Sequence, residues 1–281
     1  MLQEVFPLST IHPDLSHSQA TLTAYARDPV GSVADSGQRW GVLILPGGGY
    51  GVVAPAEGEP VALAFLAAGI QAFVLEYSVA PARWPQAFLE AAAALAFLKQ
   101  NAARYGISPH RIAVCGFSAG GHLAGCLSNL WGDPLIQQKL GLAPTDVRPD
   151  ASILCYPVIS VALSAQGSTF PNLLGDDWRS SDQVKLSLDT SVTVANPPAF
   201  LWCTWEDGSV PMENTLLYAQ ILRRSAVPFD LHVFQHGPHA MGLATPDCAR
   251  DSEHHDPRAA QWFPLCVSWL HSLEGELPAE P

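Results

Sequence analysis

The feature that most limits how this 281-residue chain can fold is a series of short, almost wholly apolar runs separated by segments of helical length. Such runs predict strands of a parallel sheet that is buried on both faces. Their alternation with helices indicates an α/β architecture, with a mostly parallel central sheet and helices on both faces. The expected strands are 41–45, 72–77, 111–115, 151–156, 199–204 and 230–235, and the expected helices are 57–69, 85–105, 118–131, 213–226 and 257–273.

Two stretches depart from this rhythm. Residues 20–26 (ATLTAYA) alternate weakly, which predicts a strand of an antiparallel pair at one edge of the sheet. Residues 160–197 lie between two expected strands, and an insertion there often forms a cap or one wall of a pocket. A plain surface excursion is the alternative. We expect residues 1–281 to form a single domain that carries this insertion.

Composition narrows the class of protein. Apolar residues make up 48% of the chain and charged residues 14%, which suffices for a large core. The net charge of −12, with 14 Lys and Arg, argues against a nucleic-acid partner. No uncharged apolar stretch is long enough to span a membrane, and residues 1–15 show no secretory signal pattern.

The cysteine pattern points to a reducing compartment. None of the six cysteines forms C-x-x-C, and most lie within apolar strand or helix patterns. We expect reduced, core-filling thiols and a cytoplasmic location. A disulfide or zinc framework is the less favoured alternative.

A serine lies between glycines at positions 115–121, CGFSAGG. The spacing G-x-S-x-G comprises Gly116, Ser118 and Gly120, with an expected strand before it and an expected helix after it. This order predicts a nucleophile elbow, a sharp turn that exposes the serine Oγ at a helix N-terminus. A simple tight turn is the alternative, and the strand–turn–helix context favours the nucleophile.

A second glycine-rich turn follows the first expected strand, in LILPGGGY at 43–50. Consecutive glycines let backbone N–H groups approach a substrate closely. We expect an oxyanion hole formed by the N–H groups of Gly48, Gly49 and Ala119. A flexible turn or a phosphate-binding loop is the alternative, but no G-K-[ST] follows.

The base and its orienting acid are expected downstream of the serine, in the order Ser, Asp, His. His239 lies in QHGPHAMGL, just past the last expected strand, and its rival is His236. Asp207 lies in WEDGSVP, just past the strand that ends at Thr204, and its rival is Glu206.

The other histidines predict no metal site. His122, four residues after Ser118, is expected to pack or hydrogen-bond within the first helical turn. His232, His236 and His239 lack a carboxylate or cysteine at a known zinc-ligand spacing, and residues 253–256 (EHHD) are expected to be solvated.

Together these motifs carry a family resemblance. LPGGGY, GFSAGGHLA, the segment around WEDGSVP and FQHGPHAMGLA resemble α/β-hydrolase esterases. The chain is most similar to the acetyl xylan esterase-like or xylanase-B-like group, near the bacterial feruloyl esterases. The resemblance covers about residues 40 to 245. It implies the α/β-hydrolase fold and a triad of Ser118, Asp207 and His239.

The chain departs from the family pattern at two places. Pro238 and Ala240 flank the histidine where the family often has glycines. Glu90 stands where an aspartate is often found. Neither change touches the proposed chemistry, but both weaken any assignment of a particular substrate.

The expected function is a serine carboxylesterase for short-chain acyl esters, with acetylated sugars or xylo-oligosaccharides among the candidates. Its partner would be a small-molecule ester, and the mechanism needs no metal or organic cofactor. Tyr50, Phe117 and Trp205 are candidates for lining the substrate pocket or for the core. A lipase, a serine peptidase of the same fold and an inactive binding protein are the alternatives. The acyl group, the alcohol and assembly into a homo-oligomer stay open.

Overall fold

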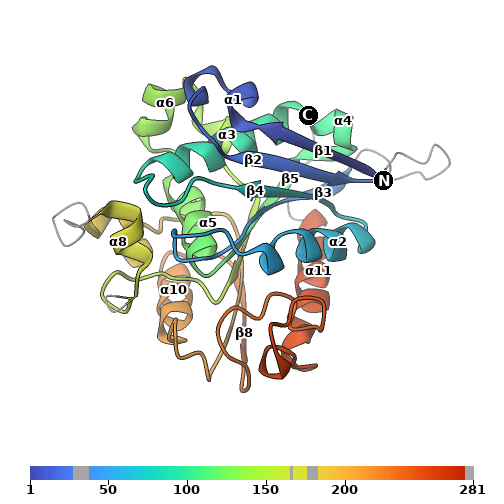
Figure 1. The fold of residues 1–281 in the computed structure, drawn as a ribbon, viewed down its shortest axis with the longest axis vertical. Coiled ribbons are helices and arrows are strands. Elements are labelled where there is room, and N and C mark those ends of the chain that lie inside the picture. The colour runs from blue at the N-terminus through green and yellow to red at the C-terminus, as the bar shows by residue number, and fades with distance from the viewer. Residues whose placement is uncertain (28–37, 165–166, 176–182, 276–281) are drawn as a thin grey trace.

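The computed structural model describes residues 1–27, 38–164, 167–175 and 183–275. Within these ranges eight strands form one sheet, in the order β1-β2-β4-β3-β5-β6-β7-β8 (Figure 1). The six strands from β3 to β8 run parallel, whereas β2 is antiparallel to both β1 and β4. The strands are β1 (Leu2–Pro7), β2 (Thr21–Ala26), β3 (Arg39–Leu45), β4 (Gln71–Glu76), β5 (Ile107–Phe117), β6 (Ala151–Cys155), β7 (Ala199–Thr204) and β8 (Phe229–Phe234).

Helices cover both faces of the sheet. In Figure 1, α2 and α11 lie to the right of the sheet, and α5 and α10 lie to the left. The longer helices are α2 (Glu59–Ala67), α3 (Gln86–Gln100), α5 (Ala119–Leu130), α6 (Pro134–Leu140), α8 (Thr169–Leu174), α10 (Glu213–Arg224) and α11 (Trp262–Ser272). Four single-turn helices are also present in the described residues: α1 (Leu8–Ile11), α4 (Ala102–Tyr105), α7 (Pro144–Val147) and α9 (Gln183–Leu186).

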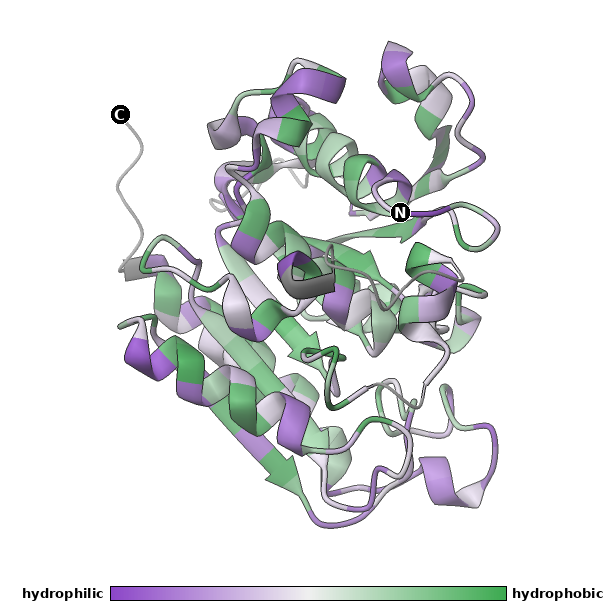
Figure 2. Cartoon of the chain, turned by 90° about the vertical axis from the view of Figure 1, so that its left-hand side faces the viewer, coloured by the Kyte–Doolittle hydropathy of each residue, from purple (hydrophilic) through white to green (hydrophobic). Residues whose placement is uncertain are grey.

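The apolar runs fill two cores because successive side chains of a strand point to opposite faces. In β3, Leu43 and Leu45 enter the core beneath α3, α5 and α10, whereas Val42 and Ile44 enter the core beneath α2 and α11. Figure 2 shows the hydrophobic colouring concentrated along the strands. The continuous apolar pattern in the sequence is therefore the pattern of a sheet buried on both faces.

The N-terminal strands form the antiparallel pair that the sequence predicts at one edge of the sheet. Residues 21–26 pair antiparallel with β1, which was not predicted and is the outermost strand of the sheet. The side chains of β1 alternate between half-buried and exposed, so this strand has one wet face. Its charged and polar residues gave no apolar run to recognise.

The expected helices agree with the structure in place, with small changes at their ends. The helix expected over 85–105 is divided at Asn101 into α3 and α4. The helix α6 was not expected, because residues 132–150 have no clear apolar period. Over the described ranges, no helix has both the length and the apolar character to cross a bilayer. All six cysteines lie in the described residues, buried and outside any disulfide.

The turn between β5 and α5 is shaped by close backbone contacts. A Cβ added to Gly116 would lie 2.1 Å from the carbonyl oxygen of Gly120, and one added to Gly120 would lie 2.0 Å from that of Leu45. Real Cβ atoms do not approach this closely, so only glycine fits at either position. The N-terminal turn of α5 is thereby packed directly onto the end of β3.

This packing predicts that Gly120→Ala destabilises the protein strongly. Because the obstacle is backbone, which cannot swing aside, we expect a loss of about 3 kcal/mol or more in the free energy of unfolding. Gly132→Ala is the matched control, since an added Cβ there meets nothing within 4 Å. Urea unfolding of both variants tests this, and equal stabilities would contradict the packing argument.

Candidate active site

Ser118 is held in a strained turn at the end of β5. Its φ is 53°, in the left-handed region that non-glycine residues rarely adopt. Its N–H donates to the carbonyl of Cys155 at 3.0 Å, and its own carbonyl accepts from the N–H groups of His122 and Val158. Such a conformation costs of order 1–3 kcal/mol and persists because the surrounding hydrogen bonds and glycine contacts enforce it.

The side chain of Ser118 begins a chain of hydrogen bonds. The Oγ of Ser118 lies 2.7 Å from Nε2 of His239, and Nδ1 of His239 lies 2.6 Å from Oδ2 of Asp207. A carboxylate only accepts, so Nδ1–H donates to Asp207, and Nε2 of the neutral imidazole accepts from the serine hydroxyl. This tautomer leaves Nε2 ready to take the hydroxyl proton.

Asp207 is buried and fixed by the loop that follows β7. Its Oδ1 accepts from the N–H groups of Ser209 and Val210 at 2.9 and 2.8 Å, and only 6% of the residue is exposed. The other oxygen is left to face His239. Residues 207–210 therefore form a turn that aims one carboxylate oxygen at the imidazole.

The rival residues pair with each other instead. Nδ1 of His236 lies 3.0 Å from Oε1 of Glu206, and about half of each side chain is exposed. Hydrogen bonds from His236 and from the N–H of Gly237 lower the pKa of Glu206. This surface pair lies beside the Ser118–His239–Asp207 chain but does not enter it.

The glycine loop (residues 46–52) passes over Ser118. The N–H of Gly47 is taken by Oε2 of Glu57 at 2.7 Å. Gly48 and Gly49 have φ values of 121° and 61°, and within the described part of the chain no acceptor meets their N–H groups. Ala119 opens α5, where the first N–H groups have no partner in the helix. The three residues expected to form an oxyanion hole thus keep free donors.

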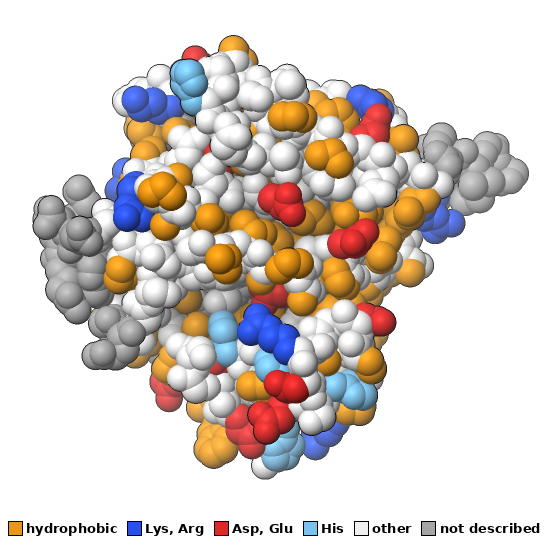
Figure 3. All heavy atoms as spheres, viewed as in Figure 1, with side chains coloured by type: hydrophobic (Ala, Val, Ile, Leu, Met, Phe, Trp, Pro, Cys, Tyr) orange, Lys and Arg blue, Asp and Glu red, His pale blue; other side chains and the backbone are white. Residues whose placement is uncertain are grey.

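Ser118, His239, Gly48 and Gly49 line a cavity of about 770 Å³, whereas Ala119 is buried and is not among the lining residues. Small and polar residues dominate its wall, and the basic side chains of Arg250, His239 and His254 also reach it. Figure 3 shows a Lys or Arg side chain with histidine side chains near it in the lower half of this face. The other lining residues are Gly48, Gly49, Val52, Val53, Ala54, Pro55, Ala56, Glu57, Ser118, Gly167, Ser168, Thr169, Ser209, Val210, Pro238 and Ala240.

The insertion between β6 and β7 supplies part of that wall. Gly167, Ser168 and Thr169 line the cavity from the start of α8. The side-chain amide of Asn172, in α8, donates to the carbonyl of Gly49 at 2.9 Å. The insertion is therefore tied to the glycine loop. Residues 165–166 and 176–182, which belong to the expected cap, lie outside the described residues.

The aromatic side chains expected at the pocket do not line this cavity. Tyr50 and Phe117 are buried, with 2% and 0% of their surface exposed, and pack in the cores on opposite faces of the sheet. Trp205 is 63% exposed and borders a different hollow, beside Val233 and Phe234. Of the two alternatives that the sequence left open, pocket or core, the structure places Tyr50 and Phe117 in the core.

His122, in α5, holds neighbouring segments together by hydrogen bonds. Its Nδ1 accepts from the hydroxyl of Tyr50 at 2.9 Å, and its Nε2–H donates to the carbonyl of Leu186 at 2.8 Å. Complete burial lowers the pKa of His122 to about 4, so the ring is neutral at pH 7. It joins the glycine loop, α5 and the insertion without reaching the serine.

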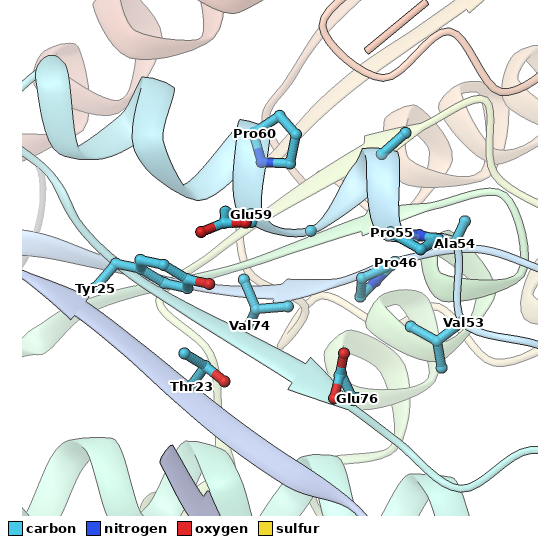
Figure 4. Close-up of a pocket in the computed structure, with 12 residues that line it drawn as sticks. Thr23, Tyr25, Pro46, Val53, Ala54, Pro55, Glu59, Pro60, Val74 and Glu76 are labelled. Carbon is cyan, nitrogen blue, oxygen red and sulfur yellow. The ribbon is translucent and has the colours of Figure 1, made fainter. Parts of the chain in front are cut away.

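A second cavity, of about 380 Å³, is separate from the candidate site. It shares the wall of residues 53–56, and its other walls are formed by Pro46, β2, β4 and the start of α2. Figure 4 shows the hydroxyl of Tyr25 and the carboxylates of Glu59 and Glu76 around it. Neither Ser118 nor His239 lines it, so it takes no part in the hydrogen-bond chain.

Comparison with known families agrees with this geometry. The family model BD-FAE matches residues 41–222, which is more than half of the chain and spans the glycine loop, the elbow and Asp207. The chain belongs to the BD-FAE family of α/β hydrolases. His239 lies beyond the matched segment, so its place beside Ser118 comes from the structure alone.

Relatives of this BD-FAE chain carry esterase and xylanase names. The endo-1,4-beta-xylanase B of Butyrivibrio fibrisolvens is 34% identical over 207 residues, covering 72% of this chain. Those residues are 32% of that relative, so this chain spans about a third of its length. The acetyl ester-xyloside bifunctional hydrolase of Caldicellulosiruptor lactoaceticus is 37% identical, with a TM-score of 0.78, over 92% of this chain and 90% of that one. The carboxylesterase Cest-2923 of Lactobacillus plantarum WCFS1 is 26% identical, with a TM-score of 0.83, over 100% of both chains.

Two residues at this BD-FAE site were not foreseen. Glu57 lies at the first position of the helix expected over 57–69 but is 2% exposed, and burial raises its pKa although hydrogen bonds from Tyr156 and Gly47 oppose the rise. Tyr156 follows β6, and its ring centroid lies 5.1 Å from that of His239. Tyr156 has a positive φ, and no pattern in the sequence predicts this conformation for an aromatic residue. Its position beside His239 is therefore seen only in the structure.

The geometry distinguishes Asp207 from its neighbour Glu206. Asp207→Asn leaves the imidazole without its orienting carboxylate, and we expect kcat for ester hydrolysis to fall by about 10³–10⁴-fold. Glu206→Gln is the matched control, because that exposed side chain bonds to His236 and to the N–H of Gly237 but not to His239, and its kcat should stay within about threefold. Steady-state kinetics on one ester compares them. A larger loss in Glu206→Gln would reverse the assignment.

The buried imidazole of His122 predicts a pH-dependent stability. The unfolded chain takes up a proton at this residue below about pH 6.5, but the folded chain does so only near pH 4. The contribution is therefore fully present above pH 6.5 and is lost as the pH falls toward 4, by roughly 3 kcal/mol in all. We expect the difference in free energy of unfolding between wild type and His122→Gln to shrink by about this amount between pH 7.5 and 4.5. A constant difference would contradict burial of the neutral ring.

Proposed function

We propose that this chain is a serine carboxylesterase that hydrolyses short-chain acyl esters. The observation that carries the proposal is the hydrogen-bond chain from Ser118 through His239 to Asp207, opening into a cavity with free backbone donors. The family membership and the carboxylesterase and acetyl ester hydrolase names among similar structures support the same reaction class.

The proposed mechanism follows from the tautomer and the donors. Ser118 Oγ attacks the ester carbonyl while Nε2 of His239 takes its proton and then delivers it to the leaving alcohol. Asp207 holds the imidazole and stabilises the imidazolium. The N–H groups of Gly48, Gly49 and Ala119 receive the oxyanion. Water, activated by the same histidine, then hydrolyses the acyl-enzyme and releases the acid.

The cavity favours small acyl groups and polar alcohols. Glycine, serine and threonine residues form part of the wall beside small apolar residues, and the basic side chains named above also reach it. A long acyl chain would need a continuous apolar surface, whereas a sugar hydroxyl finds hydrogen-bond partners here. Acetylated sugars or xylo-oligosaccharides are therefore the substrates we propose first, with the 160–197 insertion as one wall of the pocket.

The proposal extends to the domain organisation, the cellular compartment and the cofactor requirement of the chain. We propose one α/β-hydrolase domain in which the insertion is an integral wall. The six buried thiols, free of disulfides, support a reducing compartment such as the cytoplasm. The reaction as written needs no metal or organic cofactor, because the three side chains and the backbone donors supply each step.

The first test is hydrolysis of p-nitrophenyl esters from acetate to decanoate, followed by acetylated xylo-oligosaccharides. We expect acetate to be cleaved best and Ser118→Ala to lose at least about 10⁴-fold in kcat, because the nucleophile is gone. Ser128→Ala is the matched control, since that serine is also buried in α5 and donates only to the carbonyl of Ala124.

Two outcomes would contradict the proposal. Faster cleavage of decanoate than acetate would favour a lipase. Equal inertness of wild type and Ser118→Ala on every ester would favour a peptidase or a binding protein of this fold.

A further inference from the structure

Glu57 is a buried carboxylate in the wall of the candidate site that the proposed mechanism does not use. It is 2% exposed and borders the cavity that holds Ser118 and His239. Each of its oxygens accepts one hydrogen bond: Oε2 from the N–H of Gly47 at 2.7 Å and Oε1 from the hydroxyl of Tyr156 at 2.8 Å. The two donors come from different sides of the site.

The first bond fixes the start of the glycine loop. The N–H of the Pro46–Gly47 peptide donates to Glu57, and its carbonyl accepts from the hydroxyl of Tyr77 at 2.6 Å. Both ends of this peptide are thus held by buried side chains. A Cβ added at Gly47 would lie 3.0 Å from the Cβ of Ser118, so the fixed peptide lies directly against the serine. The next two N–H groups are those of Gly48 and Gly49.

The second bond reaches the histidine loop (residues 235–243). The hydroxyl of Tyr156 donates to Glu57 and accepts from the N–H of Gly242 at 2.9 Å. The ring of Tyr156 meets the imidazole of His239 edge-on, with centroids 5.1 Å apart and planes at 70°. Tyr156 therefore holds the backbone of the histidine loop with its hydroxyl and the imidazole with its ring.

The burial of Glu57 and the backbone conformation of Tyr156 both cost free energy of folding. Burial raises the pKa of Glu57, so keeping its carboxylate ionised carries a desolvation cost. Tyr156 has a φ of 37°, a genuine outlier for a bulky side chain. Costly groups that cluster at a site and join its parts indicate a role in holding geometry.

We propose that Glu57 is a positioning residue that, through Tyr156, keeps the glycine loop and the histidine loop in register across Ser118. The carboxylate is the common acceptor of both loops, so its loss lets the oxyanion donors and the imidazole shift independently. The catalytic consequence rests on the esterase function proposed above. The coupling between the two loops is a property of the folded chain itself.

The test compares three variants on p-nitrophenyl acetate. Glu57→Gln keeps the size of the side chain but replaces one acceptor oxygen by an NH2 group, which then faces either the N–H of Gly47 or the hydroxyl of Tyr156. Tyr156→Phe removes the hydroxyl that bonds to both Glu57 and Gly242. Glu90→Gln is the matched control: Glu90 is fully buried and accepts from Ser18, Ser78 and Gln86, none of which lines the catalytic cavity.

The proposal predicts a specific kinetic pattern. Glu57→Gln and Tyr156→Phe each lower kcat about 10–100-fold, with KM changed less than about threefold, because misplaced groups raise the barrier more than they weaken binding. The double variant is no slower than the slower single variant, since both changes break one connection. Glu90→Gln, measured on its folded fraction, keeps kcat within about twofold.

A second readout does not depend on activity. Amide hydrogen exchange should quicken together in the glycine loop (residues 46–52) and the histidine loop (residues 235–243) of Glu57→Gln and of Tyr156→Phe, with the strands of the sheet unchanged. Glu90→Gln should leave both segments as in the wild type. If Glu57→Gln does not fold, Tyr156→Phe alone decides both readouts.

The outcomes separate this proposal from the proposed function. Unchanged kcat in folded Glu57→Gln, or faster exchange in only one of the two loops, would overturn the positioning role. A wild type that cleaves no ester would defeat the esterase proposal, and the exchange pattern would then decide the positioning role alone. Coupled exchange together with a selective fall in kcat would support both.

Discussion

The close packing of the turn after β5 onto the end of β3 is the constraint on which the site depends. A backbone carbonyl occupies the space where a side chain at Gly116 or Gly120 would lie, so the turn can be made only with glycine. The same packing forces Ser118 into a positive φ and brings the glycine loop within contact distance of its Cβ. The position of Ser118, of the neighbouring N–H donors and of the N-terminus of α5 is thus set by one steric condition, which the hydrogen bond to Cys155 reinforces.

Much of the architecture could be predicted because burial on both faces leaves a direct trace in the sequence. The apolar runs of β3 to β7 mark the middle of the sheet, and the helices between them follow. β1 escaped detection because one of its faces is wet and its sequence, LQEVFP, mixes charged and apolar residues without a run. Residues 2–7 form a strand because they pair with residues 21–26, and not because their own sequence has a strong strand propensity.

Some residues of the candidate site could be predicted from their local sequence, whereas others depend on contacts between distant parts of the chain. Ser118, Asp207 and His239 each sit in a turn of Gly and Pro at a strand end, so their neighbourhoods could be recognised before their geometry was known. The role of Glu57 could not be recognised, because a glutamate before a helix is normally solvated. Its partner Tyr156 is 99 residues away, and no residue near Glu57 in the sequence indicates this contact. The sequence left the aromatic residues near the motifs open between pocket and core for the same reason, since packing decides a side chain's direction within a tight turn.

The order of the parts along the chain has a consequence during synthesis. Ser118 precedes His239 by 121 residues, and β8, which leads to the histidine, is the last strand added to the sheet. A nascent chain therefore exposes the serine and the glycine loop well before the imidazole leaves the ribosome. Under the proposed mechanism, Ser118 is therefore without its general base until β8 and the loop that carries His239 have been made.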